Sequence, residues 1–376
     1  MAGIYIHIPF CKSFCNYCDF YSITNLNDIS KLTDAIITEA GRQTGYLEGE
    51  VVDTVYFGGG TPSLLSVEDT KAILFAVSKN FKVQSNAEIT IEANPDDIYA
   101  GYLKQLAKIG VNRLSLGVQS WDNKRLKYLG RRHTAEQSAE ALEMAFSEGF
   151  KNVSVDLIYG IPGMNAEDLK KDLDKTFTYP IRHLSAYHLT IEEETRFGKM
   201  KKEGKLVEID EELSAAMFAL LGSECKERGF VHYEISNFAS EGYISRHNSS
   251  YWKQIPYLGL GPSAHSFNGR SRQWNISDVR RYIQAINRGE VPFEREELDK
   301  VTMFNEYVMT SLRTMWGIDL EHVEKMYDKE LHDYLVNLSD KYIRYGLMRH
   351  HKNTLILTDQ GKMISDNIIA ELLMDL

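Results

Sequence analysis

Short β-rich runs alternate with amphipathic helical stretches between residue 3 and about residue 240, and this alternation limits the possible folds more than any other feature. It favours βα units around a parallel sheet. Six such units, rather than eight, predict an α/β fold with a partial (β/α)6 barrel. The candidate strands are Ile4–Ile8, Asp53–Phe57, Glu88–Ala93, Arg113–Gln119, Val153–Tyr159 and Leu184–Leu189.

Glycine-rich and polar residues follow several of these strands directly. Examples are Gly58-Gly59-Gly60, Asn94-Pro95 and Gly160-Ile161-Pro162-Gly163. Such residues break strands and begin loops. In βα barrels the carboxyl ends of the strands carry the active site, so the functional residues are expected at this end.

The pattern changes beyond residue 240. We expect a barrel over residues 1–240, a linking region over 241–293 and a smaller domain over 294–376. The last domain is predicted to contain three helices, a hairpin around Lys352-Asn353 and a final helix from about Asp359, the order of a winged-helix-like domain. The three predicted helices are Val301–Trp316, Leu320–Lys329 and Leu331–Tyr345.

Charge argues against nucleic acid as a partner. The chain has 43 Lys and Arg against 53 Asp and Glu, for a formal net charge of -10. That charge repels phosphate backbones, and the winged-helix-like domain is acidic as well. A protein contact or a lid over substrate is the expected role of this domain. The sequence shows neither a signal peptide nor a long apolar run, which predicts a cytoplasmic protein whose membrane contact, if any, is peripheral.

Cys11, Cys15 and Cys18 form a C-x3-C-x2-C loop directly after the first predicted strand. Three close thiolates can hold three irons of a cubane 4Fe-4S cluster and leave the fourth iron open. The alternative is a zinc site, for which His7 is the only nearby candidate for a fourth ligand. Aromatic residues around the cysteines (Phe14, Tyr17 and Phe20) are expected to exclude water from a cluster. Cys225 lies in a helical stretch and is expected to be a small buried apolar residue.

This cysteine spacing, with Tyr17 directly before the last cysteine, resembles the signature of radical S-adenosylmethionine (SAM) proteins. The glycines of Tyr56-Phe57-Gly58-Gly59-Gly60-Thr61-Pro62 would allow a close approach of the methionyl part of SAM. Further segments are similar, over nearly the whole chain, to the family of oxygen-independent coproporphyrinogen III oxidases and the related haem chaperones of the HemW type. These segments are IYIHIPFCKSFCNYCDFYS, YFGGGTPS, IEANP, LSLGVQS, LGRRH, DLIYGIPG and YLGLGPSAHS.

The resemblance implies a set of cofactor-binding residues. In this family SAM chelates the open iron. An electron from the cluster then cleaves a C–S bond of SAM. The residues implied are Tyr5 and Tyr17 near the cluster, Gly59, Gly60 and Thr61 at SAM, and Glu92, Gln119, Arg131 and Asp156 at its polar groups. Position alone leaves two alternatives open: Asp156 could form a structural ion pair, and Arg131 could be a solvated charge beside Arg132.

Two departures from the oxidase pattern favour the chaperones. The oxidases extend the motif to C-x3-C-x2-C-x-C and carry a segment before it, whereas residue 20 is Phe here and the cluster motif begins at residue 11. In addition, His247-Asn248-Ser249-Ser250-Tyr251-Trp252 matches the H-N-x-x-Y-W motif associated with haem in the chaperones. Histidine is a common haem ligand, and Tyr and Trp can stack on the macrocycle.

The sequence therefore predicts a protein that binds haem, a 4Fe-4S cluster and SAM, with His247, Tyr251 and Trp252 at the haem. His265 is a second candidate ligand, and a hydrogen-bonded core histidine is the alternative for His247. The expected partners are an electron donor for the cluster and haem-receiving proteins, respiratory ones at the membrane face among them. The rival functions are a coproporphyrinogen III oxidase or another radical SAM enzyme, and a zinc-stabilised scaffold without chemistry.

Overall fold

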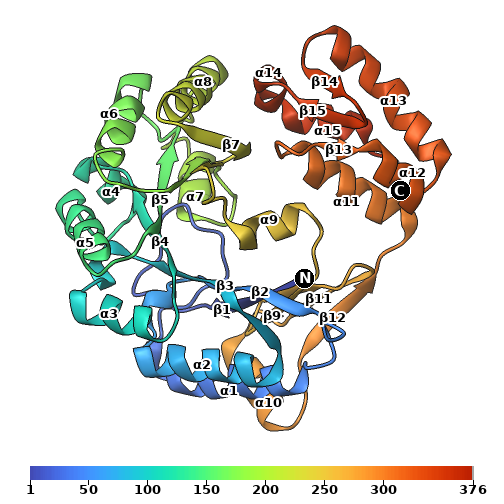
Figure 1. Ribbon diagram of the computed structural model, residues 1–376. Helices are drawn as coiled ribbons and strands as arrows, with labels where there is room; N and C mark the ends of the chain where they lie inside the picture. The colour runs from blue at the N-terminus through green and yellow to red at the C-terminus, as the bar shows by residue number, and fades with distance from the viewer. Residues whose placement is uncertain (375–376) are drawn as a thin grey trace.

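The protein is described by a computed structural model over residues 1–374. A twelve-stranded sheet forms its larger part, in the order β12-β11-β10-β9-β1-β2-β3-β4-β5-β6-β8-β7. Strands β1 to β6 are parallel to one another, and helices connect them (Figure 1). The order has two ends, so the predicted partial barrel of six βα units is confirmed.

Five of the six parallel strands lie within about two residues of their predicted bounds, and β3 begins at Lys82 instead of Glu88. They are β1 (Ala2–Ile8), β2 (Val51–Gly59), β3 (Lys82–Ala93), β4 (Arg113–Gln119), β5 (Asn152–Tyr159) and β6 (His183–His188). The helices over the barrel are α1 (Ile29–Arg42), α2 (Val67–Asn80), α3 (Ala100–Lys108), α4 (Asn123–Leu129), α5 (Ala135–Ser147), α6 (Ala166–Thr176), α7 (Arg196–Lys202) and α8 (Glu211–Glu227). Short 3-10 turns are η1 (Leu26–Asp28), η2 (Pro62–Leu64) and η3 (Pro95–Asp97).

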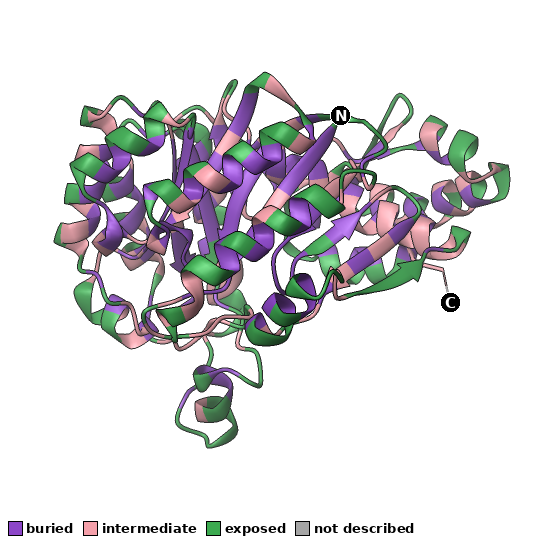
Figure 2. Ribbon diagram, turned by 90° about the horizontal axis from the view of Figure 1, so that it is seen from below, coloured by how far each residue is buried: buried purple, intermediate pink, exposed green. Residues whose placement is uncertain are grey.

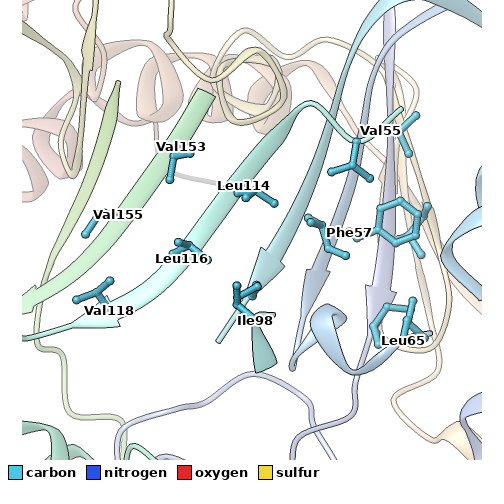
Figure 3. Close-up of a cluster of buried hydrophobic side chains, with 14 of the residues drawn as sticks. Val55, Phe57, Leu65, Ile98, Leu114, Leu116, Val118, Val153 and Val155 are labelled. Carbon is cyan, nitrogen blue, oxygen red and sulfur yellow. The ribbon is translucent and has the colours of Figure 1, made fainter. Parts of the chain in front are cut away.

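An apolar core lies between the parallel strands and the helices that cover their outer face. Figure 3 shows Val55, Phe57, Leu114, Leu116 and Val153 on neighbouring strands, and all five are at most 1% exposed. The helices bury one face against this sheet and leave the other in solvent, as Figure 2 shows by the purple and green sides of each ribbon.

The apolar residues of α1 recur at helical spacing and follow this rule. Leu32, Ile36 and Ala40 are buried, as the helical spacing of the sequence predicts. Glu39 of the same helix is buried too, which the apolar pattern does not predict.

Further strands extend the parallel sheet at both edges. Strand β9 (Tyr257–Leu260) pairs in parallel with β1, and β10 (His265–Phe267), β11 (Ser271–Asn275) and β12 (Phe293–Glu297) continue as antiparallel neighbours. At the other edge, β8 (Asn237–Ser240) and β7 (Phe230–Glu234) follow β6. Residues 241–293, expected as a linking region, thus supply three strands of the sheet together with α9 (Arg246–Trp252) and α10 (Val279–Asn287).

The C-terminal unit has its own apolar core, built around Phe304, Val308, Leu335 and Leu355. Its order of helices followed by a hairpin and further helices agrees with the winged-helix-like prediction. The elements are α11 (Lys300–Leu312), β13 (Ile318–Asp319), α12 (Leu320–Met326), α13 (Lys329–Arg344), β14 (Met348–His351), β15 (Thr354–Leu357), α14 (Asp359–Met363) and α15 (Ser365–Leu372).

The C-terminal unit is joined to the barrel beside β7 and α9, and in Figure 1 α9 lies between the two parts. The backbone N–H of Met315 donates to the carbonyl of Tyr233 at 2.9 Å, and Glu234 forms a β-bridge with Thr314. None of the helices within residues 1–374 has the length and apolar character needed to cross a membrane.

Candidate functional site

A cavity of about 550 Å³ lies at the carboxyl ends of the parallel strands, where the βα pattern predicts the active site. It brings together most of the predicted residues from six different strand ends and loops. Those lining it are Cys11, Cys15, Cys18, Tyr17, Gly59, Gly60, Thr61, Glu92, Gln119, Arg131 and Asp156.

The cysteine loop is tied to the barrel on both sides. The N–H of Cys11 donates to the carbonyl of Ile23 at 2.9 Å. Asn16 bonds the end of α4 through its backbone N–H to Leu129 (2.9 Å) and through its side chain to the carbonyl of Tyr128 (2.7 Å). These bonds fix the loop, so the three thiols share the cavity although they sit on irregular backbone.

The three thiols form a donor set that fits an iron-sulfur cluster. All three are free and partly exposed toward the cavity. Among residues 1–374 no three His, Cys, Asp or Glu side chains converge closely enough to hold one metal ion. Each cysteine of a cubane cluster binds a different iron, so a cluster does not need that convergence. Burial raises the pKa of Cys11, and it raises the pKa of Cys18 to about 11, so iron binding must release protons from these thiols.

A guanidinium and a hydroxyl accompany the sulfur atoms. Nη1 of Arg131 lies 3.3 Å from Sγ of Cys15, and Oγ1 of Thr61 lies 3.4 Å from Sγ of Cys11. Hydrogen bonds and positive charge near thiolates stabilise their ionised form.

Arg131 is not the solvated charge that its position allowed. Its Nη2 donates to the carbonyl of Gly117 at 3.0 Å and to the side chain of Asn94, so the guanidinium is fixed toward the cavity. Its neighbour Arg132 is the exposed member of the pair, and its guanidinium forms a salt bridge with Asp96 at 2.8 Å.

The glycines at the end of β2 leave space that a side chain would fill. A Cβ at Gly60 would lie 2.8 Å from the carbonyl oxygen of Phe10 and 3.0 Å from Sγ of Cys11. At Gly59, whose φ is +110°, a Cβ would meet the ring of His7 at 2.7 Å. The cradle beside the cysteines therefore requires glycine, and it presents backbone groups to a ligand.

Glu92 and Asp156 supply carboxyl groups from the inner face of the barrel. Tyr56 donates its hydroxyl to Glu92 at 2.7 Å, and burial raises the pKa of Glu92 to about 7. Asp156 accepts from the hydroxyl of Ser115 at 3.1 Å and from that of Ser154 at 3.3 Å. Its hydrogen-bond partners are thus hydroxyls. Within residues 1–374 no cationic group lies within salt-bridge distance of Asp156, although the charge of buried Arg113 acts on it from farther away.

Gln119 ends β4 in a left-handed conformation, with a φ of 68°. That region is uncommon for a residue with a side chain, and such strain concentrates at functional sites. The strand turns here, and the amide of Gln119 lines the cavity.

Two aromatic predictions have a mixed outcome. Tyr17 lines the cavity and burial raises its pKa. Phe14 and Phe20 also line it, yet they are 58% and 72% exposed, so they lie at its mouth and do not seal it. Tyr5 is not among the lining residues: its hydroxyl lies 3.1 Å from Nδ1 of His7, inside the barrel wall.

The H-N-x-x-Y-W motif forms α9, and its histidine is buried. His247 is 1% exposed, its Nδ1 lies 2.8 Å from Oγ1 of Thr54, and its Nε2 lies 2.8 Å from the hydroxyl of Tyr251. Burial lowers the pKa of His247 to about 3, so the ring is neutral. Neither nitrogen is free to bind iron in this conformation, because each already has a hydrogen-bond partner.

Of the other two predicted residues of the motif, Tyr251 stays beside His247, whereas Trp252 points elsewhere. Trp252 is half-buried and lines a second cavity, between the barrel and the C-terminal unit. His265, the second candidate ligand, stacks on Trp274 with ring centroids 6.1 Å apart.

Sequence reasoning missed several residues of the first cavity, among them Asn94, Ser115, Tyr187 and His188. Asn94 and Ser115 fall within the quoted segments IEANP and LSLGVQS. Tyr187 and His188 end β6, and the strand-end rule that located the other residues could have found them.

Comparison with known proteins gives two matching family models. The Radical SAM superfamily model matches residues 5–176, and the HemN C-terminal domain model matches residues 298–364. The solved structure of the Escherichia coli coproporphyrinogen III oxidase HemN, described as a radical SAM enzyme, is similar in fold with a TM-score of 0.86. It covers 100% of this chain and 90% of that one at 22% identity.

Curated relatives match over the full length. The heme chaperone HemW of Bacillus subtilis (strain 168) is 32% identical, over 100% of both chains. The heme chaperone HemW of Lactococcus lactis subsp. lactis (strain IL1403) is 32% identical over 99% of this chain and 97% of that one, and the protein of that name from Mycobacterium tuberculosis (strain ATCC 25618 / H37Rv) is 32% identical over 99% and 94%.

Proposed function

The chain belongs to the family of the HemW proteins within the radical SAM superfamily, and from this premise we propose that it is a haem chaperone, which binds haem and delivers it to recipient proteins. The observation that carries the proposal is the end-to-end similarity to curated haem chaperones. Fold alone does not distinguish chaperone from enzyme.

Membership of the radical SAM superfamily implies a 4Fe-4S cluster and SAM. When bound, these groups supply reducing and radical chemistry. We assign the cluster to Cys11, Cys15 and Cys18, and SAM to the cavity beside them. The glycine cradle, the buried guanidinium of Arg131 and the carboxyl groups of Glu92 and Asp156 support this assignment, because SAM carries both ammonium and carboxylate groups.

Residue 20 favours a chaperone over an oxidative decarboxylase. The oxidase pattern places a fourth cysteine two residues after the third, and this chain has Phe20 there, largely exposed at the mouth of the cavity. An apolar side chain at that place offers no sulfur to a metal or a substrate.

The proposed partners follow from the same function. A protein electron donor must reduce the cluster, and haem-receiving proteins, including respiratory ones at the membrane face, must take the haem. We propose a cytoplasmic location with peripheral membrane contact. We assign the motif residues His247, Tyr251 and Trp252 to the part of the chain that binds haem. His247 is buried and both its ring nitrogens are hydrogen-bonded, so its part in haem binding is to hold α9 in place.

The test combines two readouts on one anaerobic sample. The cluster is reconstituted, haem is added and difference spectra are recorded, while coproporphyrinogen III decarboxylation is assayed in parallel. A haem chaperone should give stable haem binding and no decarboxylation. Decarboxylation that depends on SAM would make the protein an oxidase instead.

The cluster assignment has its own control. Cys11→Ala, Cys15→Ala and Cys18→Ala should each lower the iron content well below about four irons per chain, because each removes one ligand. Cys225→Ala should retain the iron, since Cys225 lies buried in α8, outside the cavity. Zinc in place of iron after anaerobic purification would support the scaffold alternative.

A further inference from the structure

A second cavity, of about 560 Å³, lies between α9, the β10 region and the C-terminal unit. Its volume falls in the range of small-molecule and cofactor sites, about 300–1,000 Å³. Aromatic side chains from both parts of the molecule line it, notably Trp252 from α9 and Tyr307, Trp316 and Tyr327 from the C-terminal unit. None of its lining residues also lines the cysteine cavity.

A histidine whose ring makes no hydrogen bond within residues 1–374 lines this cavity. His322 is half-buried on α12, and its ring lies against those of Tyr307 and Tyr327, with centroids 4.8 and 6.4 Å away. Within residues 1–374 no side-chain hydrogen bond engages its ring; only its backbone N–H is bonded, to Asp319. A ring nitrogen must offer its lone pair to bind iron, and His322 can do so whereas His247 cannot.

The cavity also offers aromatic side chains and an ammonium group, which suit the macrocycle and the propionates of haem. Trp252 offers an indole surface for stacking on a macrocycle, whereas Lys253 covers one face of Trp316. The ammonium of Lys253 lies 4.0 Å from the centroid of Trp316, and among the described residues no carboxylate pairs with it. It is therefore available to a propionate.

The acidic groups at the cavity are already engaged. Glu306 forms a salt bridge with Arg272 at 2.7 Å. Asp319 caps α12 by accepting the N–H groups of Glu321 and His322. Neither carboxylate is left to repel a bound anion at full strength.

Helix α9 links the buried His247 to this cavity, because Trp252 at the end of the same helix lines the cavity. His247 is held by Thr54, and Glu88 accepts the backbone N–H groups of Arg246 and His247 at 3.1 and 3.0 Å. These bonds fix the short helix whose last residue is Trp252. His247 can thus affect haem binding by positioning a cavity wall without touching the iron.

We propose that haem docks in the cavity between the barrel and the C-terminal unit, with the imidazole of His322 as an iron ligand and Trp252 against the macrocycle. The inference rests on the proposed function, that the chain binds haem. It adds in which cavity the haem lies and which side chain binds its iron. His247 is a positioning residue in this arrangement.

The most direct test of His322 as the iron ligand is to replace its ligating nitrogen by sulfur. His322→Cys replaces an imidazole nitrogen by a thiolate, so the reduced, carbon monoxide-bound haem complex should absorb at longer wavelength, as thiolate-ligated haem does. His247→Cys is the matched control and should leave that band where the wild type has it. A shift in His247→Cys and none in His322→Cys would overturn the proposal and make His247 the ligand.

Affinity provides the second measurement. Haem titration of His322→Ala should give a Kd at least about tenfold higher than the wild type, the loss expected for one ligand. His350→Ala should bind as the wild type does, because His350 is exposed on β14 and does not line the cavity. Iron content and SAM binding, measured on each variant, report whether the barrel remains folded.

The outcomes separate the two claims. Wild-type protein that binds no haem removes the proposed function and this inference together. Wild-type protein that binds haem, with unchanged affinity and spectra in both His322 variants, leaves the chaperone function standing and overturns only the cavity assignment.

Discussion

At the scale of single residues, the cysteine site requires a glycine at position 60, because no side chain fits there. Gly60 passes so close to Phe10 and Cys11 that an added methyl group would lie 2.8 Å from the carbonyl oxygen of Phe10 and 3.0 Å from Sγ of Cys11. The backbone there cannot yield easily, because the N–H of Gly60 donates to the carbonyl of Ile8 at 2.9 Å.

We therefore expect Gly60→Ala to displace the cysteine loop and to lower the iron content after reconstitution. Gly41→Ala is the matched control: no atom lies within 4 Å of its added Cβ, and alanine in helix α1 should stabilise the fold by about 0.5–1 kcal/mol. Iron analysis and thermal unfolding of both variants measure the difference. Full iron retention in Gly60→Ala would show that the loop adapts.

Residue types and spacing predicted most of this site, since the cysteines, Gly59, Gly60, Thr61, Glu92, Gln119, Arg131 and Asp156 all line one cavity. The same reasoning could not determine the environment of His247. Its partner Thr54 is 193 residues away in sequence, and a motif does not reveal whether its histidine meets solvent or the barrel wall. Tyr5 was predicted near the cluster but lies elsewhere for a related reason. The strand pattern shows which face of the sheet Tyr5 is on, but only the packed structure shows that its hydroxyl meets His7.

At the scale of elements, α9 is held at its N-terminus by one carboxylate. Glu88 of β3 is buried and accepts two N–H groups of the helix. Helix N-termini leave such N–H groups without partners inside the helix, and the macrodipole favours a negative charge there.

Glu88→Ala should lower the free energy of unfolding by about 1–3 kcal/mol, because buried N–H groups lose their acceptor. Amide hydrogen exchange of α9 should accelerate at the same time. Glu68→Ala, at an exposed position of α2, should change neither quantity appreciably. Unchanged exchange in Glu88→Ala would mean that other contacts suffice to hold α9.

A second carboxylate joins α1 to α10 and the loop after β9. Buried Glu39 accepts hydrogen bonds from the N–H of Gly261, the side chain of Asn275 and the hydroxyl of Tyr282. Burial raises the pKa of Glu39 from 4.5 to about 7 despite these donors.

The folded protein therefore holds a proton on Glu39 at pH values where the unfolded chain has lost it. This contribution to stability is complete below about pH 4.5 and is lost as pH rises through about 7, with a slope of at most about 1.4 kcal/mol per pH unit. Chemical denaturation across this range should show the slope reduced in Glu39→Gln and kept in Glu140→Gln, whose position on α5 is exposed. An identical pH profile for wild type and Glu39→Gln would contradict the prediction.

Strand positions followed from the sequence because alternating apolar runs and glycine breaks are local signals. The extension of the sheet by β9 to β12 did not follow, since pairing between β9 and β1 joins segments more than 250 residues apart. Short strands with mixed polarity, such as β12 with its exposed Glu and Arg residues, resemble loops in sequence.

At the scale of the whole molecule, the two cavities are separate compartments. One lies at the carboxyl ends of the barrel strands and the other between the barrel and the C-terminal unit. Sequence reasoning could not predict the second, because it is formed by segments that meet only when both parts pack.

Haem and SAM should consequently bind together. We expect saturating SAM to change the Kd for haem by less than about fivefold, the lower end of typical coupling between sites. Haem titrations with and without SAM on cluster-loaded protein measure this. Competition, in which one ligand displaces the other, would place both in a single cavity.

The apolar cores of the barrel and of the C-terminal unit have no side chain in common. Substitutions inside one core should thus have nearly additive effects with substitutions inside the other. Over evolutionary time each part can change its packing without compensation in its neighbour. The second cavity is lined from both parts, so a change in either core that moves its surface would reshape this cavity and leave the lining of the cysteine cavity intact.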